Sequence, residues 1–246
     1  MKYILPLLLS VVCAFGQLEL KRKSIGDLAA ALTVTNGPSA PAPTEVQSKT
    51  YASSASSTTH TINFSSASAG NLLVVTVVGD DYMASAPSGW TKCLPTQAAE
   101  DYTGTYVIYK VAAGGETNVT ATIGSSTSCC LWMGEYSNVS TLDKVVGTIG
   151  QTDPITCGPS GTTTAANAVV VACAGVSTSS GTPTLVGWIT DTGFVGKADL
   201  IATVSGSLVA NKTAVRIVSS AGSYTATADM SGTGSSHNSG IIAAFK

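Results

Sequence analysis

The sequence predicts an all-β protein, an antiparallel β-sandwich of the jelly-roll or immunoglobulin-like kind built from two pseudo-equivalent halves. Short runs rich in Val, Ile, Thr and Tyr alternate with Gly, Ser, Asn and Pro along most of the 246 residues. That pattern is typical of strands joined by turns. Two runs, Leu72–Val78 and Ala168–Ala174, are almost continuously apolar, so we expect both to be central strands covered on both faces.

The prediction of two halves comes from a repeat in the chain. The run "NLLVVTVVGD" at 71–80 is matched by "NAVVVACAGV" at 167–176, each opened by Asn. Further along, Trp90 in a Gly-Trp-Thr triplet recurs as Trp188 in a Gly-Trp-Ile triplet, in the same order. Two related halves with loops of different length would give this arrangement.

The first residues resemble a secretory signal peptide. Lys2 precedes an apolar stretch, and Ala14 and Gly16 supply the small residues that favour cleavage before Gln17. The apolar stretch is shorter than the roughly 20 residues that a spanning helix needs. We therefore expect a secreted or cell-surface protein with no membrane span in the mature chain.

The expected domain organisation follows from the remaining composition. A signal peptide at 1–16 is followed at 17–46 by a short helix and a Pro-rich linker. The sandwich would occupy 47–246, with halves at about 47–147 and 148–246.

The composition argues against nucleic-acid binding. Only 11% of residues are charged, the mean hydropathy is +0.30 and the net charge is −2. Residues 51–246 carry seven basic and eleven acidic side chains, whereas nucleic-acid binding requires clustered Lys and Arg.

Export would place the cysteines in an oxidising compartment, where disulfides are expected. Five cysteines remain after the signal peptide, so one of them would stay unpaired in a monomer. The connectivity does not follow from the sequence. The five are Cys93, Cys129, Cys130, Cys157 and Cys173.

The stretch "LWMGEYSNVSTLD" at 131–143 resembles a β-sandwich module of secreted bacterial surface proteins and of phage virion or tail proteins. That module often carries an "EYSG…LD" phrase, and the resemblance extends over roughly residues 45–246. Asn138 stands where Gly is usual, but Asn tolerates a left-handed backbone better than most residues. The resemblance implies a fold and an extracellular or virion location, with no established activity.

Catalytic signatures are sparse, and we predict that the protein is not an enzyme. The only histidines, His60 and His237, lie in Ser-, Thr- and Gly-rich segments where we expect exposed turns or edge positions, and no Gly-x-Ser-x-Gly elbow is present. Glu135 follows an apolar run and would be the acid of a glycan hydrolase or lyase if its pKa were raised. The competing interpretation is that Glu135 binds turn amides or a cation and fixes the end of its strand.

Exposed aromatic side chains at strand ends would suit sugar binding, since their faces stack on pyranose rings. The candidates are Tyr82, Tyr102, Trp90 and Trp188. The equivalent repeat positions of the two tryptophans favour a core role for them, which leaves the two tyrosines as better candidates. Asp80 and Asp81 follow the first apolar strand and would supply oxygen ligands for Ca²⁺ if a turn brought them together.

These observations lead to a functional expectation. The chain is expected to be a secreted, non-catalytic structural or adhesion module of a surface, an appendage or a virion, with neighbouring subunits or glycans as partners. The alternative is a carbohydrate-binding module, assisted by Ca²⁺ in one form of the hypothesis, and a glycan hydrolase or lyase is the second alternative.

Overall fold

The structure is a computed structural model that describes residues 40–83, 85–94, 104–149, 153–178, 187–190, 193–230 and 236–246. Ala42–Lys246 is one compact unit. The expected signal peptide and short helix lie outside the described residues. The first strand begins at Thr44, inside the expected linker.

The regular structure of the described residues consists of strands, which confirms the predicted all-β class. No helix in this part of the chain is long and apolar enough to cross a membrane. The strands are β1 (Thr44–Asn63), β2 (Leu72–Gly79), β3 (Thr91–Lys92), β4 (Gly104–Val111), β5 (Asn118–Ser137), β6 (Leu142–Ile149), β7 (Ile155–Cys157), β8 (Ala168–Thr178), β9 (Gly187–Thr190), β10 (Val195–Val204), β11 (Ser207–Val218), β12 (Ala226–Asp229) and β13 (Ser236–Phe245).

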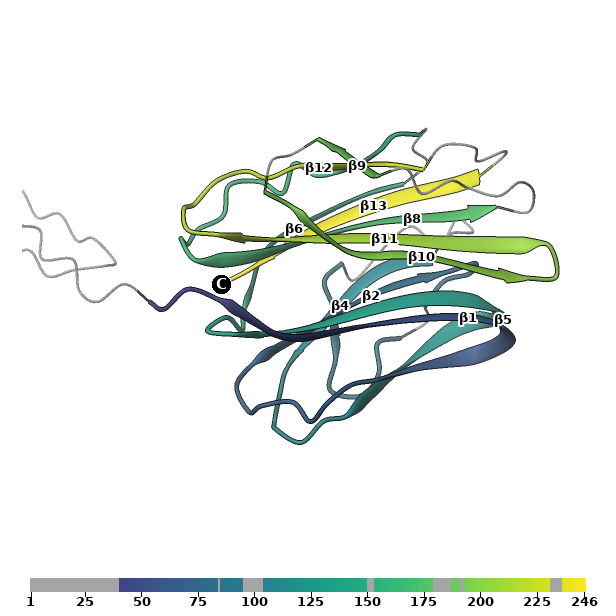
Figure 1. Ribbon diagram of the computed structural model, residues 1–246, viewed down its shortest axis with the longest axis horizontal. Helices are drawn as coiled ribbons and strands as arrows, with labels where there is room; N and C mark the ends of the chain where they lie inside the picture. The colour runs from purple at the N-terminus through teal and green to yellow at the C-terminus, as the bar shows by residue number, and fades with distance from the viewer. Residues whose placement is uncertain are drawn as a thin grey trace, which may run out of the picture. The chain divides into compact units, whose positions relative to one another are not determined.

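These strands form three antiparallel sheets. Sheet A has the order β1-β5-β2-β4-β3, sheet B the order β10-β11-β8-β13-β6, and sheet C the order β7-β12-β9. Figure 1 shows sheet B between sheet C above and sheet A below. The predicted antiparallel sandwich is thus confirmed, with sheet C as an added layer.

Sheets A and B pack face to face over the inter-sheet core, in which alternate residues of both central strands meet. Leu72, Val74 and Val78 of β2 belong to it, and so do Val169 and Val171 of β8. The largest side chains in this core come from the flanking strands β5 and β13: Trp132, Tyr136 and Phe245.

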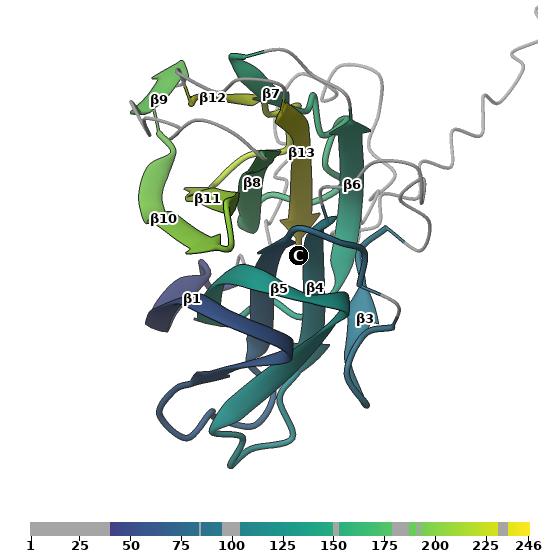
Figure 2. The ribbon, with the colours of Figure 1, turned by 90° about the vertical axis from the view of Figure 1, so that its right-hand side faces the viewer.

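The outer face of sheet A is covered by the chain's own longest strands. β1 and β5 each have 20 residues, and their pairing shifts register between Ser53 and Thr59. Beyond the shift they form a two-stranded arm, visible in Figure 2 below the sheet. The arm contributes Ile62, Val119 and Ile123 to the outer core of sheet A, where they pack with residues such as Leu73, Val75 and Leu131.

Sheet C covers the outer face of sheet B. The core between them is rich in small side chains, including Ala172 and Ala174 of β8 and Ala226 and Ala228 of β12. A Cβ on Gly240 of β13 would lie 3.0 Å from the sulfur of Cys157 in β7. Small residues therefore let the two layers approach closely.

Both apolar runs occupy the positions that the sequence predicted. Every residue of β2 and every residue of β8 is buried. β2 lies between β5 and β4, and β8 between β11 and β13. Each central strand sends one set of side chains into the inter-sheet core and the alternate set into an outer core, as expected for strands covered on both faces.

The relation between the two halves stays a prediction. The strand pairing differs by one residue from the alignment that the sequence suggested. Leu72 pairs with Tyr136, whereas Val169, not Ala168, pairs with Phe245. Matching the two runs by their opening Asn aligns Leu72 with Ala168, which lies on the opposite face of its sheet. A shift of one residue exchanges the faces of a strand, so matching the two runs by the face that each residue presents requires a shift of one position.

The expected boundary between the halves falls inside a strand. β6 spans Leu142–Ile149 and pairs with β13 in sheet B. The chain therefore passes from sheet A to sheet B between β5 and β6, before residue 142 rather than near 147. Asn138 lies in this crossing with a φ of 61°, which confirms that it takes the left-handed backbone expected of it.

A buried hydrogen-bond network links sheets A and B inside the apolar core. The Asn211 side chain of β11 donates from Nδ2 to the Thr76 hydroxyl of β2 at 3.1 Å and to the Cys130 carbonyl of β5 at 3.3 Å. Its Oδ1 accepts from the Thr213 hydroxyl at 2.8 Å. All four residues are fully buried, so their polar groups depend on one another for partners.

Replacing Asn211 by Ala should lower the free energy of unfolding by about 2 to 3 kcal/mol, because the hydroxyls of Thr76 and Thr213 and the Cys130 carbonyl lose a buried partner. Chemical denaturation followed by tryptophan fluorescence measures this change. Asn118→Ala, at an exposed position of β5, is the matched control and should change the value by less than about 0.5 kcal/mol. Equal losses for the two variants would contradict a special role of the network.

The cysteines depart from the expected disulfides. Cys93, Cys129, Cys130, Cys157 and Cys173 are all buried free thiols. Burial raises the pKa of Cys130 and of Cys173 to about 12, and it raises the pKa of the other three as well. Such thiols are protonated and unreactive at neutral pH, and they pack as small apolar side chains.

Candidate functional site

The most exposed aromatic residue of the described chain lies directly after sheet A's central strand. Tyr82 is 50% exposed, the only Tyr, Trp or Phe among the exposed large apolar side chains of the described residues. A Cβ placed on Gly124 in β5 would lie 2.8 Å from the Tyr82 ring. The absence of a side chain at Gly124 therefore lets the ring lie against the backbone of β5 while its other side faces solvent.

A second glycine makes room for the same segment. A Cβ on Gly104, at the start of β4, would overlap the carbonyl oxygen of Asp81. Two backbone-related hydrogen bonds then hold the segment in place. The amide of Gly124 donates to the Tyr82 carbonyl at 2.8 Å, and the amide of Tyr82 donates to Oδ1 of Asp81 at 2.7 Å. These contacts position Tyr82. We call the group formed by Tyr82, Asp81 and the two glycines that admit them, Gly104 and Gly124, the Tyr82 platform.

Charged and phenolic groups lie beside the platform. The ammonium of Lys92 in β3 donates to the carbonyl of Met83 and lies 4.9 Å from the centre of the Tyr106 ring. Burial raises the pKa of Tyr106, a bond with the Met83 backbone lowers it, and the charge of Asp81 raises it again. Burial also lowers the pKa of Lys92. The Lys92 ammonium therefore contacts the Met83 carbonyl and the face of the Tyr106 ring.

The two aspartates proposed as calcium ligands have different partners. The carboxylate of Asp80 accepts hydrogen bonds from the hydroxyls of Ser177 in β8 and Ser207 in β11. Asp80 therefore connects the end of β2 to sheet B, whereas Asp81 belongs to the Tyr82 platform. Among the described residues there is no group of three or more His, Cys, Asp or Glu that could hold a metal ion.

The other aromatic candidates lie elsewhere. Trp90 is half-buried and packs against the outer core of sheet A. Trp188 is half-buried against the core between sheets B and C, with its indole nitrogen buried. Both positions fit the core role that the repeat suggested. Tyr102 lies outside the described residues.

His60 lies in the edge strand β1, one of the expected positions, but its side chain is buried rather than exposed. His60 lies in the arm of β1, is 1% exposed, and its Nε2 is 3.0 Å from the Ser57 carbonyl. Burial lowers its pKa despite hydrogen bonds with the backbone. His237 is exposed at the start of β13, as expected.

Glu135 is fully buried and saturated with donors. Its carboxylate accepts hydrogen bonds from the Gln47 amide at 2.6 Å, the Asn71 amide at 2.6 Å and the Ser68 backbone at 2.9 Å. Burial raises its pKa, but these bonds outweigh that effect and hold the pKa below its ordinary value. A carboxylate of lowered pKa is poorly suited to donate a proton. The geometry matches the structural interpretation of Glu135, in which it ties β1 and the loop before β2 to β5.

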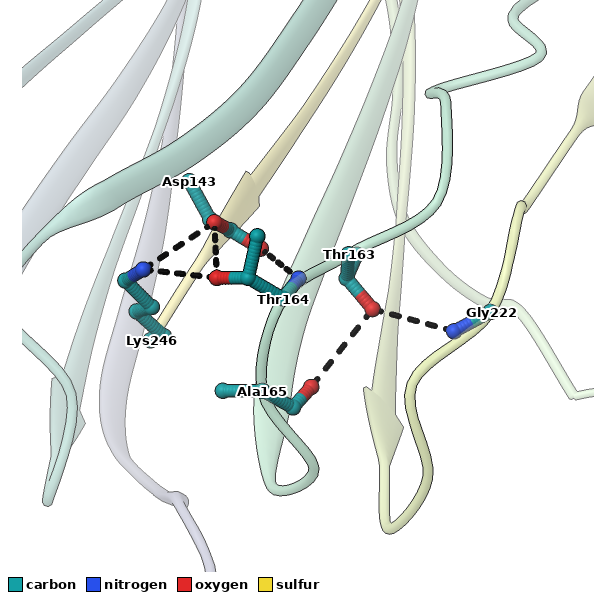
Figure 3. A network of polar contacts seen from close by, with 6 residues as sticks. All are labelled: Asp143, Thr163, Thr164, Ala165, Gly222 and Lys246. Carbon is teal, nitrogen blue, oxygen red and sulfur yellow. Dashed lines mark hydrogen bonds and ion pairs between the residues drawn. The ribbon is translucent and has the colours of Figure 1, made fainter. Parts of the chain in front are cut away.

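The carboxylate of Asp143 likewise links separate segments of the chain (Figure 3). It accepts two hydrogen bonds from Thr164, one from the backbone amide and one from the hydroxyl, each at 2.6 Å, and it pairs with Lys246 at 3.2 Å. Its side chain is almost fully buried. Burial raises its pKa, but these partners keep the pKa below its ordinary value. This contact joins the start of β6 to the loop before β8 and to the residue after β13.

The sequence singled out Tyr82 as a candidate for sugar stacking and Asp81 as a candidate calcium ligand, but it did not point to Gly104 or Gly124. Gly124 closes the "TNVTATIG" segment and had the appearance of an ordinary strand end. Its role depends on the bend of β5, which carries the arm to the 81–83 segment, and no local pattern encodes that contact.

Comparison of the chain with protein-family models, with curated proteins and with solved structures found no match. The resemblance to the β-sandwich module of surface and virion proteins therefore stays a prediction.

Replacing Glu135 by Ala should destabilise the protein by about 2 to 4 kcal/mol near neutral pH, because the donors of Gln47, Ser68 and Asn71 lose their buried, charged acceptor. The pKa of Glu135 is lowered from an ordinary value of 4.5. Its ionised form therefore contributes its full stability above pH 4.5 and loses it as the pH falls through the lowered value. Urea denaturation across this range should show that the difference in unfolding free energy between wild type and Glu135→Gln becomes smaller as the pH falls.

The control is Glu45→Gln, which removes a surface ion pair with Lys197 and should cost less than about 1 kcal/mol. If the difference between wild type and Glu135→Gln did not depend on pH, the role assigned to Glu135 would be refuted.

Proposed function

We propose that this chain is a secreted, non-catalytic β-sandwich that serves as a structural or adhesion module of a surface, an appendage or a virion. The observation that carries the proposal is the structural use of the buried carboxylates. Glu135 and Asp143 each hold two segments together through several hydrogen bonds. Carboxylates of lowered pKa, engaged in this way, stabilise loops.

The way in which the sheet edges are protected also supports a module that meets other surfaces without aggregating. Along one side, the edge strands β1 and β10 face each other through the Glu45–Lys197 ion pair at 2.6 Å. A second link runs from the Thr203 amide to the Ser54 hydroxyl at 3.1 Å. Edge strands that contact each other are shielded from unwanted pairing, which suits a protein displayed at high local concentration.

In this proposal the N-terminal segment is a tether, or it adds as a strand to a neighbouring subunit. Deleting residues 17–41, which precede β1, should abolish any assembly while the sandwich keeps its unfolding temperature. Negative-stain electron microscopy and light scattering detect assembly, and calorimetry checks the fold. A substitution of Pro38 and Pro41 by Ala, both within the deleted segment, is the matched control for the linker sequence. Assembly that survives the deletion would contradict the role of the segment.

Carbohydrate binding is the second candidate function, and the Tyr82 platform favours it. The half-exposed ring lies against Gly124, and two hydrogen bonds hold the backbone that carries it, so it loses little freedom on binding. Sugars stack on such rings while polar neighbours fix their orientation. Asp81 is the polar neighbour here, and a Ca²⁺ ion bound with its help would be an assisted form of the same function.

Binding of the chain to a glycan and polysaccharide array, with Ca²⁺ and again with EDTA, tests this second function. Tyr82→Ala should lower affinity for a bound glycan by about tenfold or more, because one stacking contact is worth about 1 to 3 kcal/mol by analogy with aromatic stacking on bases. Tyr82→Phe keeps the ring and should retain most of the affinity. Val195→Ala, at an exposed apolar position of β10, is the control for lost surface hydrophobicity. A blank array for the wild type would eliminate the carbohydrate-binding function.

A further inference from the structure

The charge beside the Tyr82 platform bears on which glycans it would accept. Oδ2 of Asp81 and the Tyr82 ring both lie within 3.0 Å of the point where a Gly124 Cβ would stand. The carboxylate and the ring therefore share the space beside Gly124. The other carboxylate oxygen, Oδ1, already accepts the Tyr82 amide at 2.7 Å, which fixes the direction in which Oδ2 points.

Among the described residues, two charged groups lie at the platform, the carboxylate of Asp81 and the ammonium of Lys92. Lys92 directs its ammonium to the Met83 carbonyl and the Tyr106 ring. Asp80 points to Ser177 and Ser207 in sheet B. A ligand that stacks on Tyr82 thus meets the negative charge of Asp81 beside the ring.

We propose that Asp81 is the specificity-determining residue of the Tyr82 platform, which takes neutral glycans and rejects acidic ones. The inference rests on the carbohydrate-binding function proposed above. Oδ2 accepts hydrogen bonds from the hydroxyls of a stacked neutral sugar, and such bonds to an ionised acceptor are stronger than bonds between neutral groups. A uronate or sulfate at the same place would bring two negative charges together.

The test compares neutral with acidic polysaccharides on the same variants. Affinity electrophoresis would use galactomannan, β-glucan and arabinoxylan as neutral probes, and polygalacturonate and alginate as acidic probes, at low ionic strength. Wild type should be retarded by at least one neutral probe and by neither acidic probe. Asp81→Asn keeps the acceptor for the Tyr82 amide and removes the charge. It should raise the ratio of acidic to neutral affinity by about fivefold, the factor for two unit charges about 4 Å apart in water.

Two controls separate charge from structure. Glu45→Gln makes the same change in net charge at the opposite end of sheet A and should leave the ratio unchanged. High salt should shrink the difference between wild type and Asp81→Asn, because salt screens exposed charges. Thermal unfolding verifies that each variant is folded.

The outcomes distinguish a failure of the role proposed for Asp81 from a failure of the carbohydrate-binding function. If Tyr82→Ala abolishes retardation but Asp81→Asn leaves the ratio of affinities unchanged, the platform binds glycans and the role of Asp81 is overturned. Equal shifts for Asp81→Asn and Glu45→Gln would also overturn it, since net charge alone would then explain the effect. If no polysaccharide retards the wild type, the carbohydrate-binding function fails, and the inference fails with it.

Discussion

The burial of both faces of β2 and β8 is the constraint on which the rest of the structure depends. A strand that is apolar on both sides requires a cover on each side of its sheet, and two such strands in two sheets require three interfaces. The sheets supply one of these by packing on each other. The chain supplies the other two differently, with a folded-back arm of β1 and β5 over sheet A and a separate sheet C over sheet B.

The second feature is how a chain with few charges arranges its polar groups. Neutral side chains bridge the sheets in the interior, where Asn211 joins Thr76 and Thr213. Charged carboxylates lie near the strand ends, where Glu135 and Asp143 hold loops. A neutral amide or hydroxyl is less costly to bury than an ion. Paired neutral groups also fix how one sheet lies on the other, since a shifted sheet would leave them without partners.

The Tyr82 platform is a consequence of the first constraint. Because β5 bends to carry its arm over sheet A, Gly124 comes to lie beside the segment that leaves β2. The absent side chains at Gly104 and Gly124 then admit that segment, and Tyr82 keeps half of its surface in solvent. Neighbouring side chains of an extended segment point to opposite sides, so Asp81 lies beside the ring whereas Asp80 turns toward sheet B.

The sequence by itself determined the all-β class, the two buried central strands, the left-handed Asn138 and the exposed tyrosine after β2, because each of these follows from residue preferences and a period of two along one strand. Only the tertiary structure decided that His60 is buried, that the cysteines are free thiols, that Asp80 binds Ser177 and Ser207, and that Gly124 supports Tyr82. These contacts join residues far apart in the chain. They depend on the register of the sheets and on the bend in β5, and a displacement of one residue, as between Ala168 and Val169, reverses the face that a side chain presents.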